Sequence, residues 1–425
     1  MDEKNLALEA IRKKLVGKRL SYKEIYAVMD EIAKDKLGDV LTTYFVASGY
    51  SEGFSDDELY FLTKAMVETG EHLDFHGVVA DKHSIGGVPG TRVTMILVPI
   101  IAAAGFKIPK SSSRAITTPA GTADCMEAIA GVTFSKEEIY KIVEETGGCI
   151  VWGGSFKIAP ADDDIIKIEE PLLFESYDKI VVSVMAKKVA FGSTHVVIDL
   201  PYGRTAKIHR MEEAEVLKRK FEYLGRKFNV KIKTFIHKIE QPAGNGVGPL
   251  LEARDAIKVL EQKEDRPIRL EELAINAAGQ LLDLCLKDAN QQIKEKFSKK
   301  YKSGEEWASD LLTTGAAFTK FKEIVKAQGG DGNISSIKLE LAKFAKPIKS
   351  EKKGTIKKIS SKSVTVIAKI LGCPVDKRAG IFIEKMLGEE VEKDDEVMVL
   401  YSDSEYRLKE ATDSLALFPI FDIEK

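Results

Sequence analysis

The spacing of apolar residues changes twice along the chain. From residue 5 to residue 70 the apolar positions recur at helical spacing with no strand-like alternation between them. Ser21 with Glu24, and Ser55 with Glu58, have the three-residue spacing at which a serine and a glutamate cap each other's backbone at the start of a helix. The N-terminal segment is therefore predicted to be a small all-helical lobe.

From Phe75 onward, short β-rich runs alternate with helical patterns. Helices are expected after Gly90, Gly121 and Ser135, the last with Glu138 at capping-box spacing. This alternation predicts a mixed or mostly parallel sheet covered by helices. The expected strands are 77–80, 106–108, 149–152, 196–200 and 230–236.

The pattern changes again near residue 347, where short strand-like runs separated by turns return. Strands are expected at 354–359, 364–370, 381–383 and 397–401, with a turn at 388–391. The predicted fold class is α/β, with a small C-terminal α+β domain suited to packing or assembly. The predicted domains are 1–72 (helical lobe), 73–159 with 191–345 (α/β domain) and 346–425 (C-terminal domain).

Composition is that of a soluble globular protein. The 425 residues are 44% hydrophobic and 31% charged, enough for two or three domains with their own cores. A net charge of −2 gives no general attraction to nucleic acid, so any anion site must be local. The longest apolar run, 93–106, is too short to span a bilayer, and the N-terminus lacks a signal-peptide pattern. A cytoplasmic protein without a membrane or nucleic-acid partner is expected.

Cysteine and histidine spacing gives no metal or disulfide pattern. The six histidines are not at metal-ligand spacing, and no CxxC pair occurs. Buried, reduced thiols are expected at Cys125, Cys149, Cys285 and Cys373.

Residues 81–91 (DKHSIGGVPGT) form the first of two polar loops that follow predicted strands. The glycines let the backbone turn its N–H groups inward, and the helix expected from Val93 to Ala104 offers unpaired N–H groups at its start. Such a corner is typical of an anion site, most often for phosphate. The alternative is an ordinary glycine-rich turn with a solvated lysine.

The second loop, residues 110–124 (KSSSRAITTPAGTAD), combines hydroxyl groups, one arginine and a second helix start at which Thr122 is a candidate N-cap. A serine- and threonine-rich surface loop is the alternative. Because both loops end strands of a βαβ pattern, they are expected at one sheet edge, where open α/β sheets bind ligands.

Four motifs together resemble the thymidine/pyrimidine nucleoside phosphorylase family. The closer likeness is to its archaeal-type branch, the AMP phosphorylases, and it extends from about Leu6 to the C-terminus. The motifs are Asp-Lys-His-Ser-x-Gly-Gly from Asp81, Ser-Ser-Arg-Ala-Ile-Thr from Ser112, Ala-Gly-Thr-Ala-Asp from Ala120 and Ala-Pro-Ala-Asp from Ala159.

The resemblance implies a fold and an activity. Residues 160–190 would return to complete the helical lobe, with a ligand cleft between the lobes and hinges at Gly153, Gly154 and Gly192. The implied enzyme is a pentosyltransferase of nucleotide salvage that converts AMP and phosphate to adenine and ribose 1,5-bisphosphate, with CMP and UMP as further candidate substrates. The first alternative is a thymidine or pyrimidine nucleoside phosphorylase that yields (deoxy)ribose 1-phosphate.

Two other activities fit the sequence less well. A phosphoribosyltransferase would need an acidic pair after a diphosphate loop, which is lacking, and an inactive nucleotide-binding regulator is at odds with the intact motif residues. No cofactor and no metal is expected, since phosphate is a co-substrate.

A phosphorolytic site must hold phosphate against the sugar C1, bear the charge that develops there and stabilise the leaving base. The positions matching the family's phosphate ligands are Lys82, Ser84, Gly86, Thr94, Ser112 and Thr122; for Thr94 a helix cap or a surface group is the preferred alternative. Those matching AMP ligands are Gly87, Ser113, Arg114, Ala115, Ile116, Thr117, Thr118, Thr122, Ser183, Lys187 and Lys207. For Lys207 the residues alone favour a solvated loop lysine. His83 is implied to contact the sugar or the base.

Ser183 and Lys187 lie four residues apart on the helix expected at 180–190, so they share one face. Ile168 stands where pyrimidine-specific members carry an arginine, which argues against thymidine and uridine. Glu175 stands where the AMP branch has an aspartate as proton donor; a carboxylic acid still fits general acid catalysis, with Asp178 as an alternative. Members of that branch typically carry a further N-terminal domain, which the active site is expected not to need. A homodimer is expected.

Overall fold

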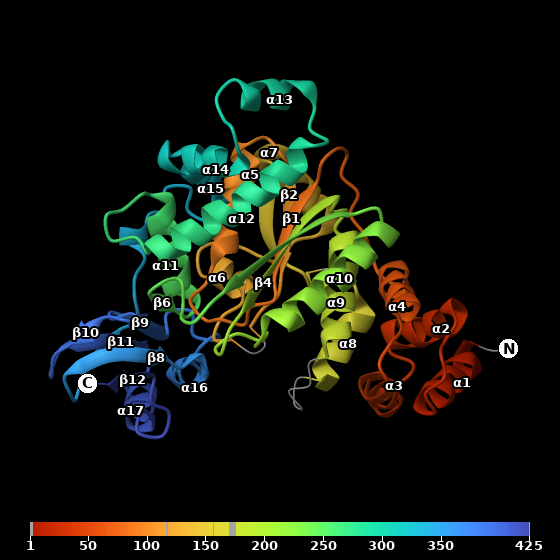
Figure 1. The fold of residues 1–425 in the computed structure, drawn as a ribbon, viewed down its shortest axis with the longest axis horizontal. Helices are drawn as coiled ribbons and strands as arrows, with labels where there is room; N and C mark the ends of the chain where they lie inside the picture. The colour runs from red at the N-terminus through yellow and green to blue at the C-terminus, as the bar shows by residue number, and fades with distance from the viewer. Residues whose placement is uncertain (1–2, 116–117, 156, 170–175, 425) are drawn as a thin grey trace.

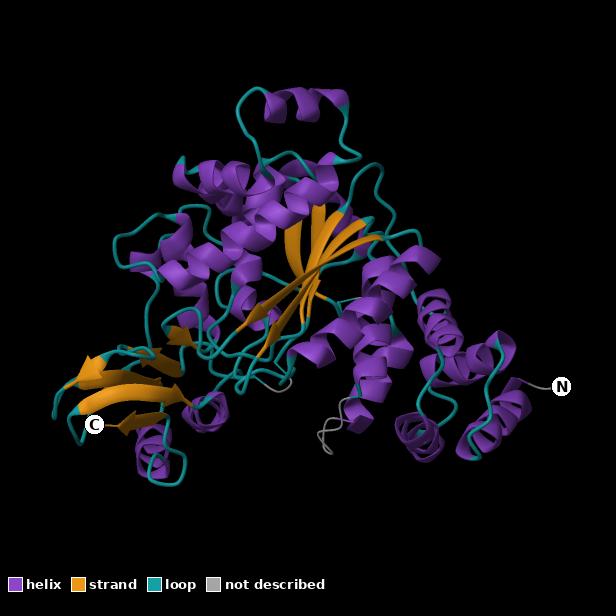
Figure 2. Cartoon of the chain, in the orientation of Figure 1, coloured by secondary structure: helices purple, strands orange, loops and turns teal. Residues whose placement is uncertain are grey.

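The computed structural model describes residues 3–115, 118–155, 157–169 and 176–424. The helices of the N-terminal segment and the strands of the C-terminal domain lie at opposite ends of the molecule, with a parallel sheet between them (Figures 1 and 2).

The helical lobe is built from α1 (Glu3–Leu15), α2 (Tyr22–Ala33), α3 (Asp39–Glu52) and α4 (Asp56–Glu68). Both capping boxes expected from the sequence, at Ser21 and Ser55, are present and confirmed. Two later helices, α8 (Pro160–Glu169) and α9 (Tyr177–Ala190), share one apolar core with these four and lie between them and the sheet in Figure 1.

The parallel sheet predicted for the middle of the chain is present. β1 (Ala80–Ser84), β4 (His195–Tyr202) and β5 (Lys231–Lys238) are parallel in the order β1–β4–β5. β2 (Ile108–Ser112) and β3 (Gly148–Trp152) form a second parallel pair, joined to β1 by a bridge between Val79 and Lys107.

The first two strands begin and end later than predicted. The sequence placed residues 81–84 and 110–112 in loops because they are polar, whereas the structure continues β1 and β2 through them. Their backbones are paired with β4 and β3, and their buried charges face opposite charges, so polarity does not end the strand.

Helices cover the sheet and supply most of the core. The apolar α5 is buried along nearly its whole length, as expected of a helix packed on all sides. In α6 the N-cap is Gly121 rather than Thr122, which is the first helical residue. The helices of this part of the chain are α5 (Val93–Ala103), α6 (Thr122–Glu127), α7 (Lys136–Thr146), α10 (Met211–Lys227), α11 (Pro249–Leu260), α12 (Ile268–Leu286), α14 (Gly304–Thr313), α15 (Ala316–Ala327) and α13 (Gln291–Ser298), the last without a buried residue.

The C-terminal domain is joined to the α/β lobe through a shared sheet. The short strand β6 (Gly246–Val247) pairs with β9, in a sheet of order β6–β9–β11–β7, and a second sheet has the order β10–β8–β12. The other elements are η2 (Ser336–Lys338), β7 (Phe344–Lys349), β8 (Gly354–Ile359), α16 (Ser361–Leu371), β9 (Gly380–Ile383), β10 (Glu390–Val391), β11 (Glu396–Ser402), α17 (Glu405–Ser414) and β12 (Phe421–Glu424).

The strand predicted at 364–370 is wrong, because this segment is helix α16. Ser360 accepts a hydrogen bond from the backbone N–H of Ser363, and the buried positions Val364, Ile367 and Leu371 follow helical spacing. The cap and this burial override the strand preference of the β-branched residues. The turn predicted at 388–391 ends in the short strand β10.

Two composition-based expectations can be compared with the described part of the chain. Within it, no helix has both the length and the apolar character needed to cross a bilayer. All four cysteines are buried and unbridged, as predicted.

The helical lobe contains a buried ion pair that gives a stability prediction. Lys14 Nζ lies 3.0 Å from Glu58 Oε1, with side chains 3% and 2% exposed. Lys14→Met leaves the buried carboxylate of Glu58 without its counter-ion, so the free energy of unfolding should fall by about 3–5 kcal/mol. Urea unfolding followed by circular dichroism measures this free energy. Lys13→Met, which breaks the more exposed pair with Glu24, should cost about 1 kcal/mol or less. Equal losses in the two variants would contradict this interpretation.

Candidate functional site

Lys82, within β1, is held by a buried carboxylate. Its Nζ lies 3.1 Å from Asp199 Oδ2, on the neighbouring strand β4. Asp199 Oδ1 lies 2.9 Å from His237 Nε2. Burial alone would raise the pKa of Asp199, but the charge of Lys82 and the bonds to His237 and Ser84 lower it to about 2. The lysine therefore has a permanently charged partner that fixes it at the sheet edge.

A second buried carboxylate, Asp81, ties β1 to α9. Its Oδ2 accepts hydrogen bonds from Lys188 Nζ at 2.6 Å and Ser193 Oγ at 3.1 Å, and its Oδ1 accepts from the backbone N–H of Lys82 at 2.7 Å. Both Asp81 and Lys188 are almost completely buried. Since α9 packs in the helical lobe, this ion pair connects the two lobes at the site.

Lys110, on β2, is farther from the same aspartate than Lys188 is: its Nζ lies 3.7 Å from Asp81 Oδ1. Burial, and then the charge of Lys188, lower the pKa of Lys110 to about 7. Lys82, Lys110 and Lys188 are thus three buried lysines. They lie beside only two aspartates, Asp81 and Asp199, which leaves an excess of positive charge for an anion when all three lysines are protonated.

His83 is half-buried beside these lysines. Burial, followed by the charges of Lys188, Lys110 and Lys82, keeps the pKa of His83 well below its usual range. The imidazole is therefore neutral near pH 7, with one nitrogen able to donate and the other to accept.

The hydroxyl groups expected to bind phosphate occupy different environments. Ser112 Oγ is buried and has no hydrogen-bond partner, so it can serve a ligand without breaking an existing bond. Thr94 is buried within α5, where Arg92 is the N-cap, so the cap or surface alternative is wrong for it. Thr122 Oγ1 accepts from Arg92 Nη1 at 3.3 Å, and Ser84 is exposed.

Lys207 packs against the glycines of the first polar loop, residues 81–91 (the glycine loop), and is not a solvated loop residue. Gly87 has a φ of +60°, and a Cβ there would lie 2.6 Å from Lys207 Cγ. The backbone N–H of Lys207 donates to Gly86 O at 3.0 Å. A Cβ on Gly86 would lie 2.9 Å from Pro201 Cγ, so both glycines permit this close approach.

Arg114 is bound on its guanidinium fork by Glu127, at 2.5 and 2.6 Å, and stacks 4.9 Å from the Trp152 ring. Lys377, from the C-terminal domain, pairs with the same Glu127 at 2.7 Å and with Asp124 at 3.1 Å. The bond to Arg114 contributes most to lowering the pKa of Glu127 to about 2. The C-terminal domain, predicted to serve packing or assembly, therefore also reaches the loop that carries Arg114 (the arginine loop).

The rest of the arginine loop is fixed by backbone contacts. The Ala115 N–H donates to Asp124 Oδ2 at 2.7 Å, and Thr118 Oγ1 donates to the carbonyl of Ala120 at 3.0 Å. Ser113 is exposed. Ile116 and Thr117 lie outside the described residues.

Ser183 and Lys187 share one face of α9, as predicted, and both point to Asp162 of α8. Ser183 Oγ donates to Asp162 Oδ2 at 2.7 Å, and Lys187 Nζ lies 2.8 Å from the same oxygen. Glu175, the candidate proton donor, lies outside the described residues.

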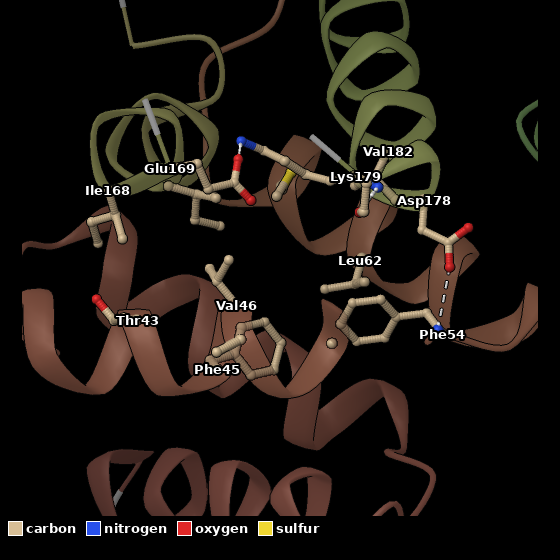
Figure 3. A pocket seen from close by; sticks show the side chains of 15 residues that line it. Thr43, Phe45, Val46, Phe54, Leu62, Ile168, Glu169, Asp178, Lys179 and Val182 are labelled. Carbon is tan, nitrogen blue, oxygen red and sulfur yellow. Dashed lines mark hydrogen bonds and ion pairs between the residues drawn. The ribbon is translucent and has the colours of Figure 1, made fainter. Parts of the chain in front are cut away.

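Asp178, the alternative donor, lies at the start of α9 and faces away from this cluster. It pairs with Lys220 and accepts from the Phe54 N–H at 3.3 Å. With Ile168 it lines a mainly apolar cavity of about 180 Å³ between α3, α4, α8 and α9 (Figure 3). Neither Lys82 nor Ser183 lines this cavity, so it is separate from the group of Lys82, Lys110 and Ser112 on β1 and β2 (the anion corner).

Sequence reasoning missed the partners of the predicted residues. Asp81 belongs to one of the motifs but carries no predicted role, and Lys110, Lys188 and Asp199 could have been noticed as charges within or beside apolar runs. No local signal identifies Lys377. Among the described residues, the three carboxylates grouped closely enough for a metal are Glu3, Asp30 and Glu31, which belong to the helical lobe.

Three family models match the chain. A glycosyl transferase family helical bundle domain matches residues 8–70, the a/b domain of that family matches 76–318, and a pyrimidine nucleoside phosphorylase C-terminal domain matches 355–417. Among solved structures, anthranilate phosphoribosyltransferase from Thermus thermophilus is similar with a TM-score of 0.60 and 18% identity, over 76% of this chain and 99% of that one, which shows a shared fold.

The similarity to known proteins extends over nearly the whole chain. AMP phosphorylase of Methanocaldococcus jannaschii is 42% identical over 98% of this chain and 81% of its own length. AMP phosphorylase of Thermofilum pendens is 41% identical over 95% and 76%. A Legionella pneumophila (strain Paris) protein described as a candidate thymidine phosphorylase is 38% identical over 96% and 76%.

The buried lysines give a binding prediction. Lys82→Met removes a full charge from the anion corner, so the dissociation constant for inorganic phosphate should rise about tenfold or more. Isothermal titration calorimetry measures it. Lys107→Met is the matched control: Lys107 directly precedes β2 and donates to the carbonyl of His76, so this variant should bind phosphate as the wild type does. Unchanged affinity in Lys82→Met would remove this lysine from the anion site.

Lys110 gives a prediction about pH. Between about 7 and its ordinary pKa of 10.5, the unfolded chain holds a proton on Lys110 that the folded chain lacks. Stability rises with pH where the unfolded state binds more protons, so the wild type should gain up to about 1.4 kcal/mol per pH unit relative to Lys110→Met. Urea unfolding of both proteins at about pH 7.5 and about pH 9 measures it. Parallel pH profiles would show that Lys110 stays charged.

Proposed function

The chain belongs to the thymidine/pyrimidine nucleoside phosphorylase family, in its AMP phosphorylase branch, and we propose that it cleaves nucleoside 5′-monophosphates with inorganic phosphate. It is a pentosyltransferase that converts AMP and phosphate to adenine and ribose 1,5-bisphosphate. The observation that carries the proposal is the anion corner at the ends of β1 and β2, where Lys82 is fixed at the sheet edge and Ser112 Oγ has no partner.

In the proposed reaction a phosphate oxygen attacks C1′ as the bond from C1′ to the base nitrogen breaks. The sugar carries positive charge in the transition state and the leaving base carries negative charge. Lys82 and the unpartnered Ser112 hydroxyl would orient the phosphate, and neutral His83 would contact the sugar or the base. Positioning and electrostatics supply most of the rate enhancement in such a site.

The nucleotide would lie between the arginine loop and α9. Arg114 would supply its positive charge from the arginine loop and Lys207 from beside Gly87 of the glycine loop, and Ser183 and Lys187 would present a polar face toward the base. Glu175 is proposed to protonate the departing base, by general acid catalysis. Ile168 supports a monophosphate substrate over thymidine because it stands where pyrimidine-specific members carry an arginine, and its side chain offers no hydrogen-bond donor to a pyrimidine.

We also propose that the enzyme is a cytoplasmic homodimer of nucleotide salvage that needs no metal or organic cofactor. Support for the dimer comes from large apolar side chains exposed on the helical lobe, a surface of the kind that protein partners cover. These are Leu15, Val16, Val40 and Tyr44, between 45% and 70% exposed.

Substrate choice is tested by adding AMP, adenosine or thymidine to the purified protein, with and without inorganic phosphate, and measuring the free base by chromatography. Adenine should appear from AMP only when phosphate is present, and adenosine and thymidine should remain largely intact. Thymine release with AMP untouched would instead establish the pyrimidine nucleoside phosphorylase alternative. AMP binding without phosphate-dependent base release would indicate a nucleotide-binding regulator.

A further inference from the structure

Asp162, the last residue of the Ala-Pro-Ala-Asp motif, is completely buried in the first turn of α8. Its Oδ2 receives the hydroxyl proton of Ser183 and an N–H of Lys187, and its Oδ1 is buried without a partner. A buried carboxylate oxygen without a partner is costly, so this residue is not explained by packing alone.

The charge state of this aspartate follows from its neighbours. Burial alone would raise the pKa of Asp162, but the ammonium groups of Lys187 and Lys179 and the bond from Ser183 lower it below its ordinary value. Asp163, the adjacent acid, lies 3.9 Å from Lys187 and is 41% exposed. Asp162 is therefore ionised at neutral pH, and an ionised carboxylate can only accept hydrogen bonds.

This fixes the hydrogen-bonding roles of Ser183 and Lys187. A serine hydroxyl has one proton, and that of Ser183 is given to Asp162, so only its lone pairs face a ligand. Lys187 has three N–H donors, of which one is given to Asp162 and the others remain. The two side chains thus present one acceptor beside one donor, a single turn apart on α9.

We propose that Asp162 is a positioning residue of the base subsite, which holds Ser183 as a hydrogen-bond acceptor and Lys187 as the adjacent donor for the base. The inference rests on the proposed function, since it assigns these side chains to the base of the nucleotide. An amino-bearing base such as adenine has the matching edge, with an exocyclic N–H beside a ring nitrogen that accepts. Unsubstituted purine, whose ring nitrogens at that edge only accept, leaves the Ser183 lone pairs unpaired.

The test compares Asp162→Asn with Asp163→Asn, which removes the same charge one residue further along α8. Asp162→Asn should raise the KM for AMP about tenfold or more, because Ser183 is free to rotate and Lys187 loses its counter-ion, while the KM for phosphate stays within about twofold. Asp163→Asn should leave both constants near those of the wild type. Equal KM values for AMP in the two variants, or a parallel rise in both constants of Asp162→Asn, would overturn the proposal.

A double-mutant cycle distinguishes positioning from a general structural role. If Asp162 acts through Ser183, then Asp162→Asn combined with Ser183→Ala should raise the KM for AMP by much less than the product of the two single effects. Multiplicative effects would overturn the proposal. If Asp162→Asn does not fold, as judged by circular dichroism, Asp162→Glu takes its place with the same expected difference between the two KM values, since it keeps the charge and displaces the carboxylate.

Selectivity for the amine is a second readout, which packing damage alone would not move. The wild type should prefer AMP over purine riboside 5′-monophosphate, which lacks the 6-amino group, and Asp162→Asn should reduce that preference about tenfold. An unchanged preference would overturn the assignment of Ser183 as acceptor. Wild-type protein that releases adenine from AMP while the Asp162 variants behave normally would refute only this inference, whereas wild-type protein that releases no adenine would refute the proposed function.

Discussion

The ion pair between Asp81 and Lys188 is the interaction on which the arrangement of the molecule depends. Asp81 lies inside β1 and Lys188 near the end of α9, so one contact of 2.6 Å joins the parallel sheet to the helical lobe. An aspartate buried this deeply is tolerated only with a charged partner and further hydrogen bonds, which Ser193 and the Lys82 N–H provide. Because Lys187, the preceding residue of α9, pairs with Asp162, two successive lysines set where the helix stands relative to both lobes.

The same geometry explains why the anion corner is basic in a protein whose net charge is only −2. Asp81 and Asp199 keep Lys188 and Lys82 in place, and Lys110 is left with a distant share of one carboxylate. A buried lysine without its own counter-ion loses its proton easily, so the positive charge of this corner depends on what occupies it. A phosphate dianion would supply the missing counter-charge.

The predictable parts of the structure are those with local signals. The Ser21 and Ser55 capping boxes, the parallel strands and the placing of Ser183 and Lys187 on one helix face follow from spacing alone. The continuation of β1 and β2 through Asp81 and Lys110 could not be predicted, because it depends on neutralising partners more than a hundred residues or a whole strand away. Helix α16 departs from the prediction because a cap and burial outweigh its β-branched composition. For Lys207, the residues alone favoured a solvated loop lysine, and only the structure shows that it packs against Gly87.

The joint between the α/β lobe and the C-terminal domain has a consequence for how such proteins can be recombined. Gly246 and Val247 complete a sheet whose other strands come from the far end of the chain, and Lys377 neutralises the acids that hold Arg114. A chimaera built by exchanging the C-terminal domain with that of a relative would therefore replace β9, the partner strand of β6, and Lys377, a counter-ion of the acids that bind Arg114. Exchange of this domain in evolution is constrained in the same way, because β6 and the strand that pairs with it have to change together.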